Sequence, residues 1–366
     1  MRIGLLTSDL TPQHGWGNYG LSVVRALANT KHNLTILAAR DSKPIDEHII
    51  HPVLTTTSPP ESNSLLKMLV RHRQIATLLN DCDIIHTTVE LYAPLVQLIA
   101  KKRPIVMTAH GSYINLPVVR RQPISWLYQS AFENSHIVCV SHYTQRIAQQ
   151  VVPKADTSVI VNAVNTHTFA DIIPQKTSYP TIVTLGGVKA RKGTFELVQA
   201  VASVREQLPD VSCHILGSMT AEPNYVARVK AEINALNLQE TVFLHGFVSD
   251  DDVREWYSKA DVFALPSINA GWKFEGFGLA TLEASAAGLP VIGTRDCGAE
   301  DAIDHNVTGL LISQDHIREE LPLALLDLLT HPDKAQAMGH AGRAKALSHT
   351  WDDVAQQLIA LYESLL

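Results

Sequence analysis

The sequence has few cysteines, and none lies in a metal-binding or redox spacing. Its four cysteines, Cys82, Cys139, Cys213 and Cys297, are far apart in the chain and form no C-x-x-C pair. The spacing therefore indicates neither a zinc site nor a disulfide framework. Seventeen histidines are present, but none falls in an H-E-x-x-H sequence. We expect no bound metal.

Long hydrophobic runs are also missing. No apolar segment approaches the roughly 18 residues that a membrane span needs. The amino-terminal stretch MRIGLLTSDL reaches Asp9 too early for a signal peptide. We therefore expect a cytoplasmic protein. Its 366 residues, 46% of them hydrophobic, are enough for two domains with separate cores.

Charge is distributed unevenly along the chain. The net charge is −6, yet residues 1–170 carry an excess of Lys and Arg over Asp and Glu. A basic first half suggests an anionic partner there, either a phospholipid surface or a phosphate-bearing acceptor. Uneven but solvated surface charge is an equally good explanation.

One helical segment, residues 64–80, could contact such a surface. Its apolar positions near one face are Leu65, Leu69, Ile75 and Leu79, and its basic positions on another are Lys67, Arg71 and Arg73. A basic amphipathic helix can lie on anionic lipid at the inner face of a membrane. An ordinary helix packed by its apolar side would show the same pattern.

Short β-branched strands alternate with helical segments in two successive runs. We expect strands at 2–7, 34–39, 83–88, 104–109 and 136–141, and then at 181–186, 211–216, 241–246, 261–266 and 290–294. Alternation of this kind favours parallel sheets covered by helices on both faces. The prediction is an α/β protein with two doubly wound, Rossmann-like domains, 1–172 and 178–345, joined by a polar linker at 171–180. Their ligand sites lie at the carboxyl ends of the strands, which can face each other across a cleft.

The segment HGWGNYG contains a G-x-G-x-x-G sequence made by Gly15, Gly17 and Gly20. Glycines at a helix start let backbone N–H groups approach a phosphate. An NAD(P)-dependent dehydrogenase would use this motif and would hold its ribose with Asp41. However, DLTPQH separates the strand from the first glycine, so the loop is longer than in the dinucleotide fingerprint. A loop that closes on some other phosphate is favoured.

Two acidic motifs are better explained by local structure than by metal binding. The D-C-D sequence at Asp81 and Asp83 could be a metal-binding D-x-D, but Asp83 directly precedes a strand and indicates a helix-to-strand turn. Ser249 followed by Asp252 predicts a capped helix start.

The segment TLGGVKARKGTFELVQAV reads as a strand, a glycine turn, a basic cluster and a helix. Lys189, Arg191 and Lys192 lie just before the N-terminus of this helix, where the helix dipole disfavours cations. Their position makes sense if an anion is held there. A solvated turn is the alternative.

The segment FEGFGLATLE, residues 274–283, joins a glycine-rich loop to a helix. Gly276 and Gly278 free the backbone, so the N–H groups of residues 277–279 should be unsatisfied at the helix start. Glu283 lies about one turn further on, while Glu275 stays on the loop. Two carboxylates suit a ligand rich in hydroxyls. They could also be the acid and base of a glycosidase, but the basic cluster favours binding and orientation.

These motifs resemble those of the retaining glycosyltransferases of family 4, which have the GT-B architecture. FEGFGLATLE is similar to their E-x7-E motif, and Gly15–Gly20 to their diphosphate loop. TAHG, with His110, resembles the strand-end histidine that reaches the transferred sugar. VNAVNTHTF resembles the stretch before the second domain. The final helix, 350–366, which starts near Trp351, resembles the one that crosses back to the first domain.

The resemblance implies a retaining, metal-independent hexosyltransferase of polysaccharide biosynthesis. It would move a sugar from a UDP-, GDP- or ADP-sugar to a glycan, lipid-linked or small-molecule acceptor, with no other cofactor and no nucleic acid. No enzymic nucleophile is apparent, so the acceptor would attack on the same face. The catalytic residues implied are Glu275, Lys192 and His110.

Each implied role falls on a matching position. Glu283 would hold the ribose, Glu275 the donor sugar, Lys192 the diphosphate, and His110 the other side of the sugar. The donor-binding set is Gly15, Gly17, Gly187, Lys189, Arg191, Lys192, Phe277, Gly278, Leu279 and Glu283.

One position departs from the family pattern. Gly187 stands where the family usually has an arginine that binds phosphate, and Lys189 or Arg191 would have to substitute for it. A non-catalytic nucleotide-sugar or glycan-binding protein on the same scaffold is therefore a second hypothesis.

Overall fold

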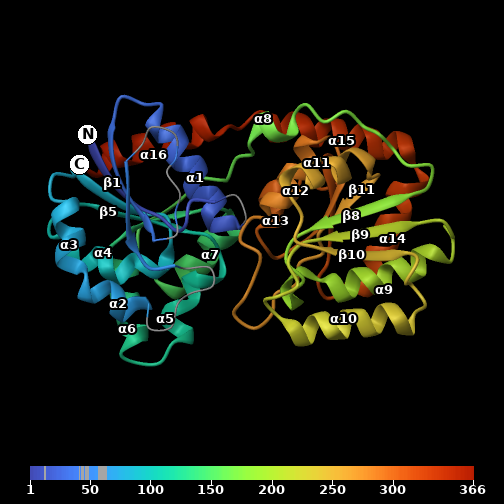
Figure 1. Ribbon diagram of the computed structural model, residues 1–366, viewed down its shortest axis with the longest axis horizontal. Helices are drawn as coiled ribbons and strands as arrows, with labels where there is room; N and C mark the ends of the chain where they lie inside the picture. The colour runs from blue at the N-terminus through green and yellow to red at the C-terminus, as the bar shows by residue number, and fades with distance from the viewer. Residues whose placement is uncertain (12–13, 41, 43–44, 46–48, 57–63) are drawn as a thin grey trace. The chain divides into compact units, whose positions relative to one another are not determined.

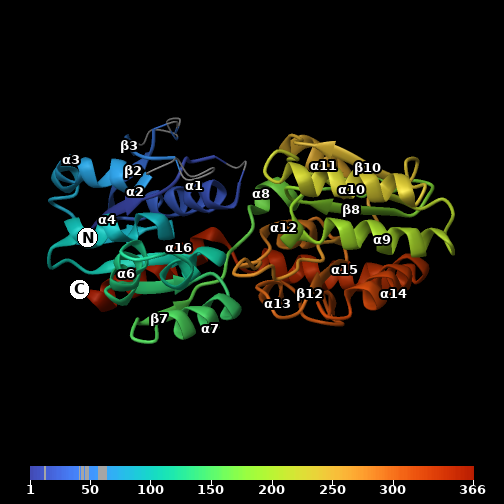
Figure 2. The ribbon, with the colours of Figure 1, turned by 90° about the horizontal axis from the view of Figure 1, so that it is seen from below.

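The computed structural model describes residues 1–11, 14–40, 42, 45, 49–56 and 64–366, without the side chains of 64, 65 and 167. The chain forms two compact units: unit 1 is 1–162 with 351–366, and unit 2 is 163–350. Each unit is a parallel sheet with helices on both faces (Figures 1 and 2). The predicted α/β class with two doubly wound sheets is confirmed.

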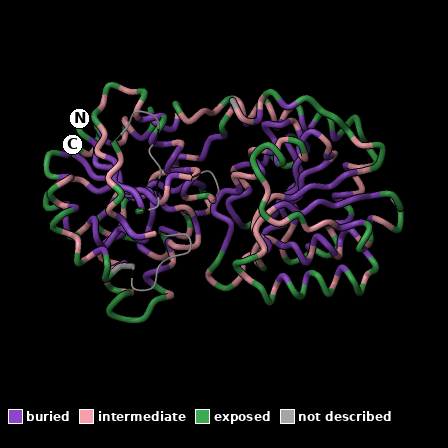
Figure 3. Tube along the Cα trace, in the orientation of Figure 1, coloured by how far each residue is buried: buried purple, intermediate pink, exposed green. Residues whose placement is uncertain are grey.

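Unit 1 is built on a seven-stranded parallel sheet in the order β3-β2-β1-β4-β5-β6-β7. The strands are β1 (Arg2–Leu6), β2 (Asn33–Ala39), β3 (Ile50–Leu54), β4 (Ile84–Thr87), β5 (Ile105–Ala109), β6 (His136–Cys139) and β7 (Thr157–Val159). The central strands β4 and β5 are buried along their whole length. Figure 3 shows buried chain, in purple, in the interior of each unit. Strands covered on both faces need apolar residues at successive positions, and IVMTA supplies them.

The helices of unit 1 connect these strands, and the chain returns at its end to add one more. They are α1 (Gly15–Ala28), α2 (Ser64–Val70), α3 (His72–Leu78), α4 (Ala93–Ala100), α5 (Leu116–Val119), α6 (Ile124–Glu133), α7 (His142–Val151) and α16 (Trp351–Leu365), with short 3₁₀ turns η1 (Glu90–Tyr92) and η2 (Ser112–Asn115). Helix α16 packs beside α1 within this unit.

The expected single helix at 64–80 is two helices, α2 and α3. Ile75 and Leu79, expected on a lipid-facing side, are fully buried. A side chain at Gly4 in β1 would meet the Leu79 side chain at 2.7 Å. This part of the expected apolar face therefore belongs to the core of unit 1, and Ile75 and Leu79 do not face lipid. The side chain of Leu65 lies outside the described residues.

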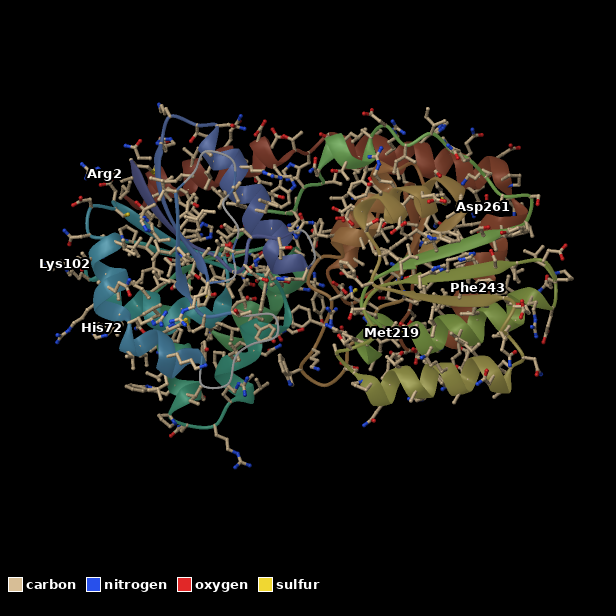
Figure 4. All side chains as sticks on the ribbon, viewed as in Figure 1. Arg2, His72, Lys102, Met219, Phe243 and Asp261 are labelled. Atoms are coloured by element: carbon tan, nitrogen blue, oxygen red, sulfur yellow. The ribbon has the colours of Figure 1, made fainter. Side chains whose placement is uncertain are left out.

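Asp83 has the structural role that its position before a strand indicates. Its Oδ2 accepts the N–H of Arg2 at 2.7 Å, which joins the starts of β1 and β4. Figure 4 labels Arg2 at this amino-terminal edge of the sheet. The D-C-D segment thus lies at the opposite edge from the ligand-binding ends of the strands.

Unit 2 has a six-stranded parallel sheet in the order β10-β9-β8-β11-β12-β13. Its strands are β8 (Thr181–Leu185), β9 (Ser212–Leu216), β10 (Val242–Gly246), β11 (Val262–Ala264), β12 (Val291–Thr294) and β13 (Gly309–Ile312). In chain order this is the 3-2-1-4-5-6 arrangement of the Rossmann fold. Figure 4 marks its two edges, with Asp261 where β11 begins and Met219 beyond the end of β9.

Eight α-helices and one 3₁₀ turn of unit 2 lie among the described residues. They are α8 (Thr166–Phe169), η3 (Ala190–Lys192), α9 (Thr194–Arg205), α10 (Pro223–Ala235), α11 (Asp250–Lys259), α12 (Leu279–Ala286), α13 (Ala299–Ala302), α14 (Ile317–Thr330) and α15 (Pro332–Leu347). Helix α11 begins with the expected cap, in which the Ser249 hydroxyl accepts the Asp252 N–H at 3.1 Å.

The boundary between the units differs from the expected one. Residues 163–172, expected in the first domain, belong to unit 2. Phe169 packs there against Tyr257, with ring centroids 5.9 Å apart. The expected linker is also held down, since the Gln175 N–H donates to the Ser258 carbonyl at 2.7 Å. The chain therefore passes from unit 1 to unit 2 about ten residues earlier than its polar composition suggests.

Candidate functional site

The site of unit 2 lies where its sheet reverses strand order. The chain leaves β8 and β11 in opposite directions, and such a switch point is where ligands bind in open α/β sheets. The two following segments are tied together here, because the Ile268 N–H donates to the Arg191 carbonyl at 2.9 Å. Gly193 makes the contact possible. It has φ +64°, and a side chain would lie 1.8 Å from the Pro266 carbonyl oxygen.

Glu275 is the centre of this site, and only 8% of it is exposed. Its Oε2 accepts hydrogen bonds from Lys192 Nζ at 2.6 Å and from Arg191 at 2.7 Å. The buried hydroxyl of Ser267 donates to the same oxygen at 3.2 Å. The structure thus joins the β8 loop and the E-x7-E segment, which lie about 80 residues apart in the chain.

The charges in this cluster determine its ionisation. Burial alone would raise the pKa of Glu275, but the charges of Lys192 and Arg191 outweigh it and bring the pKa to about 2. Burial lowers the pKa of Lys192, and the charge of Glu275 counteracts part of this change. Glu275 is therefore a carboxylate at neutral pH and too weak a base to take a proton.

Lys189 occupies the space beside Gly187. A Cβ built at Gly187 would lie 3.3 Å from Cε of Lys189, and one at Gly186 would lie 3.4 Å from Cε of Lys192. Burial and the charge of Arg191 lower the pKa of Lys189. The glycine pair therefore leaves room for two lysine side chains over the β8 turn. Lys189 lies where it could replace the missing arginine, and this role stays a prediction.

The start of α12 is open to a ligand. Gly278 precedes the helix with φ +85° and provides no side-chain cap. Among the described residues, no acceptor is recorded for the N–H groups of residues 277–279. A helix start of this kind attracts anions and polar ligands.

Gly298 fixes the loop before α12, and the sequence analysis missed it. The Gly298 N–H donates to the Glu275 carbonyl at 2.8 Å. A Cβ at Gly298 would lie only 2.0 Å from the carbonyl oxygen of Gly276. The close backbone contact holds the carboxylate and the free N–H groups in one orientation. A glycine after β12 is the only sequence signal of this contact.

Glu283 lies on α12, largely covered by the protein. Burial, followed by the charge of Asp250, raises its pKa to about 7, while Lys192 acts in the opposite direction. In the described part of the chain, no hydrogen bond to its carboxylate is recorded. A carboxyl group in this state is suited to accept hydroxyl groups of a ligand.

The remaining predicted site residues, His110, Gly15 and Gly17, belong to unit 1. His110 follows β5, and its Nε2 donates to the Thr88 carbonyl at 2.7 Å. Burial lowers the pKa of His110 to about 4, although the bond to Thr88 opposes this change. The ring is therefore neutral, its proton is on Nε2, and Nδ1 presents a lone pair.

Glu90 accepts a hydrogen bond from the backbone of His110, and no motif in the sequence points to it. It is fully buried, and its Oε1 accepts the His110 N–H at 2.7 Å. Burial raises the pKa of Glu90 to about 8, although backbone hydrogen bonds, among them those of His110 and Gly111, act in the opposite direction. Its other oxygen, Oε2, has no partner in the described residues. Glu90 thus holds the backbone of the histidine in place as a largely protonated acid.

The glycines of the amino-terminal motif mainly allow close packing. Helix α1 begins at Gly15, and the Gly17 N–H donates to His14 Nδ1 at 3.2 Å. A Cβ at Gly17 would lie 2.4 Å from the Thr11 carbonyl, and one at Gly20 would lie 2.1 Å from a threonine hydroxyl. The Gly17 N–H therefore already has a partner. A Cβ at Gly15 would meet no atom of the described residues within 4 Å. Asp41, the ribose residue of the dehydrogenase hypothesis, lies outside the described residues.

The described residues contain no group of three or more His, Cys, Asp or Glu side chains that could hold a metal ion.

Two Rossmann-like units are the architecture of the GT-B glycosyltransferases. Solved structures agree in fold. Sucrose-phosphate synthase from Thermosynechococcus elongatus superposes with a TM-score of 0.82 at 20% identity, over 100% of this chain and 98% of that one. Alr3699/HepE from Anabaena, in complex with UDP and glucose, gives 0.78 at 18% identity, over the full length of both.

Sequence comparisons narrow the class. The model "Glycosyltransferase Family 4" matches residues 14–168, and "Glycosyl transferases group 1" matches 166–345. The chain belongs to this family of glycosyltransferases, and the dehydrogenase hypothesis is excluded. A GDP-mannose-dependent alpha-(1-6)-phosphatidylinositol monomannoside mannosyltransferase of Mycobacterium tuberculosis is 28% identical, over 98% of this chain and 97% of the relative. A D-inositol 3-phosphate glycosyltransferase of Corynebacterium urealyticum is 32% identical over 50% of this chain and 42% of the relative.

Proposed function

We propose that this glycosyltransferase transfers a hexose with retention of configuration and without a metal ion. The observation that carries the proposal is the position of Arg191 and Lys192, both fixed on Glu275. Negative charge develops on the diphosphate as the sugar–phosphate bond breaks, and fixed cations stabilise it. Lys189 adds a third cation beside them. These groups supply the charge stabilisation that a divalent metal would otherwise provide.

Retention would follow from attack by the acceptor on the face that the diphosphate leaves. Glu275 is held by two cations with a pKa of about 2, so we assign it to binding the sugar hydroxyls. His110, neutral and with a lone pair on Nδ1, would accept a hydroxyl of the transferred sugar. Glu283 would accept the ribose hydroxyls. No enzymic nucleophile is required in this scheme.

We infer that the donor is GDP-mannose. The support is the relative of Mycobacterium tuberculosis, whose name specifies this donor and which matches over nearly the full length of both chains. The same name indicates a phosphoinositol lipid as the class of acceptor. A soluble inositol phosphate is the second candidate, favoured by the shorter match to a D-inositol 3-phosphate glycosyltransferase.

A lipid acceptor would require contact with a membrane, and α2 offers a surface for it. Leu66 and Val70 are 64% and 78% exposed. Lys67 and Arg71 line a hollow of about 370 Å³ together with Arg40. No described helix is long and apolar enough to cross a bilayer. We propose that this exposed side of α2, rather than the buried side, lies on anionic lipid.

Three measurements test the donor, the absence of a metal requirement and the retention of configuration. Thermal shifts are measured with GDP-mannose, UDP-glucose and ADP-glucose, because binding to the folded state raises its apparent stability. We expect the largest shift with GDP-mannose, unchanged turnover after EDTA treatment, and an α-linked product by NMR. Loss of turnover in EDTA that Mg²⁺ or Mn²⁺ restores would refute the metal-free scheme. A β-linked product would refute retention.

Membrane contact is tested separately by sedimentation with phosphatidylglycerol and phosphatidylcholine vesicles. We expect binding to the anionic vesicles alone, and its loss in Leu66→Ser/Val70→Ser. Leu323→Ser, which removes a similarly exposed leucine from unit 2, should bind as wild type. Protein left in the supernatant with both vesicle types would refute the surface.

A further inference from the structure

A buried chain of hydrogen bonds connects α16 to β4, β5 and α1 within unit 1. The Tyr362 hydroxyl on α16 lies 2.6 Å from His86 Nδ1 in β4. His86 Nε2 lies 2.8 Å from the Thr108 hydroxyl in β5, and this hydroxyl lies 3.2 Å from that of Tyr19 in α1. All four side chains are at most 1% exposed. Four elements from distant parts of the sequence are thus joined by one hydrogen-bond chain inside an apolar core.

Tyr19 is the end of this hydrogen-bond chain that contacts the predicted site residue His110. Its ring stands edge-on to His110, with centroids 4.5 Å apart at 82°. On another side the ring of Trp351 meets it at 5.6 Å and 78°. Edge-to-face pairs of this kind favour one mutual orientation of the rings. Trp351 and Tyr362, at the two ends of α16, therefore both act on Tyr19.

The ionisation state of His86 restricts which groups donate and which accept along this hydrogen-bond chain. Burial lowers the pKa of His86 to about 3, so its ring is neutral and carries a single N–H. One nitrogen must donate and the other must accept. Since His86 has neighbours on both sides, loss of the Tyr362 hydroxyl leaves a buried ring nitrogen without a partner, which is unfavourable. The orientation of Thr108 and of the Tyr19 hydroxyl then depends on α16.

We propose that α16 positions the ring of His110 through Tyr19, with Tyr362, His86 and Thr108 as the connecting groups. Tyr19 and Tyr362 are then positioning residues for sugar transfer, although neither reaches the donor. The inference rests on the proposed role of His110 as a contact of the donor sugar. It goes further by assigning to a helix at the end of the chain a part in orienting that contact.

The test is a double-mutant cycle between Tyr362→Phe and His110→Ala. We expect Tyr362→Phe to lower kcat roughly two- to tenfold, as for coupled neighbours, with little change in donor KM. In the His110→Ala background the same substitution should have no further effect. Tyr92→Phe is the matched control, because it also removes a buried hydroxyl of unit 1, one that donates to the Thr55 carbonyl. It should keep the wild-type kcat.

Thr108 provides a second pair of variants in case Tyr362→Phe folds poorly. Thr108→Val breaks the hydrogen-bond chain and should lower kcat as Tyr362→Phe does. Thr108→Ser keeps the hydroxyl and should have the wild-type kcat. A wild-type kcat in both Tyr362→Phe and Thr108→Val, or equal losses with and without His110, would overturn the proposal. Full activity of His110→Ala itself would instead remove its premise, and is recognised in that single variant.

Discussion

Lys192 Nζ and Arg191 share one acceptor, the Oε2 atom of Glu275, at 2.6 and 2.7 Å. The shared acceptor holds both cations beside the loop that precedes α12.

Lys192→Met should remove the larger part of the charge stabilisation. We expect kcat to fall by about 10²–10³, as for loss of one fixed donor to a developing charge, with a smaller change in donor KM. Release of nucleoside diphosphate in a single turnover measures it. Lys334→Met, which breaks only an exposed pair with Asp327, should be neutral. An unchanged kcat for Lys192→Met would mean that the diphosphate binds elsewhere.

Donor binding should depend on pH through Glu283. Its pKa is raised from 4.5 to about 7, so the carboxylate to which we assign the ribose hydroxyls is lost as pH falls below about 7. Donor KM should therefore rise from pH 8 to pH 6 in wild type, and Glu283→Gln should flatten this dependence. The folded state binds the extra proton between pH 4.5 and 7, so wild-type stability should decline as pH rises through that window. A profile that is unchanged in Glu283→Gln would refute the assignment.

Glu90 should limit stability on the alkaline side. Its pKa is raised from 4.5 to about 8. Between pH 4.5 and about 8 the folded state keeps a proton that the unfolded state has released, so stability declines as pH rises through this window. Glu90→Gln resembles the protonated form and should lessen the decline. Glu90→Ala should cost about 1–3 kcal/mol at neutral pH, because the His110 N–H loses its acceptor.

Thermal unfolding from pH 6 to 9 measures the effect of Glu90. Glu133→Gln, a substitution on α6 of the same unit, should follow the wild-type curve. Parallel curves for wild type and Glu90→Gln would show that Glu90 is ionised in the folded protein across this range.

Gly298→Ala should disturb the donor site from outside it. The new methyl group would lie 2.0 Å from the Gly276 carbonyl oxygen, so the loop must move. We expect a loss of about 1–3 kcal/mol in unfolding free energy, as for other overpacked sites, and a raised donor KM. Gly342→Ala lies within α15, where the nearest atom is 3.3 Å away, and should be close to neutral. Tight donor binding by Gly298→Ala would show that the loop position is unimportant.

The strands missed by sequence reasoning are all at sheet edges. β3, β7 and β13 lie at the ends of their sheets. β3 and β7 are mostly half-buried or exposed and lack a continuous apolar run. β13, with the sequence GLLI, is apolar and buried, but a run of four residues is too short to identify as a strand by its pattern. β3 even contains Pro52, which a central strand would not tolerate. The central strands, buried on both faces, were placed within one or two residues.

The candidate site was predictable where local residue type carried the signal. The basic cluster and the two glutamates stand out in the sequence, and the family resemblance placed them together. Gly298 and Glu90 did not stand out, because each acts through a contact with a segment about 20 residues away. Nothing in the residue Gly298 or Glu90 by itself distinguishes that contact from an ordinary turn.

Glu275 gives the proposed donor site a counterion of its own. A free phosphate or sulfate ion that approaches Arg191 and Lys192 must compete with a carboxylate that is already covalently in place. In the proposed scheme, the hydroxyls of a nucleotide-sugar would bind this carboxylate while its phosphates bind the cations, so both sides of the ion pair would gain a new partner. If the proposed roles hold, the ion pair would favour binding of the whole donor over binding of its anionic fragment.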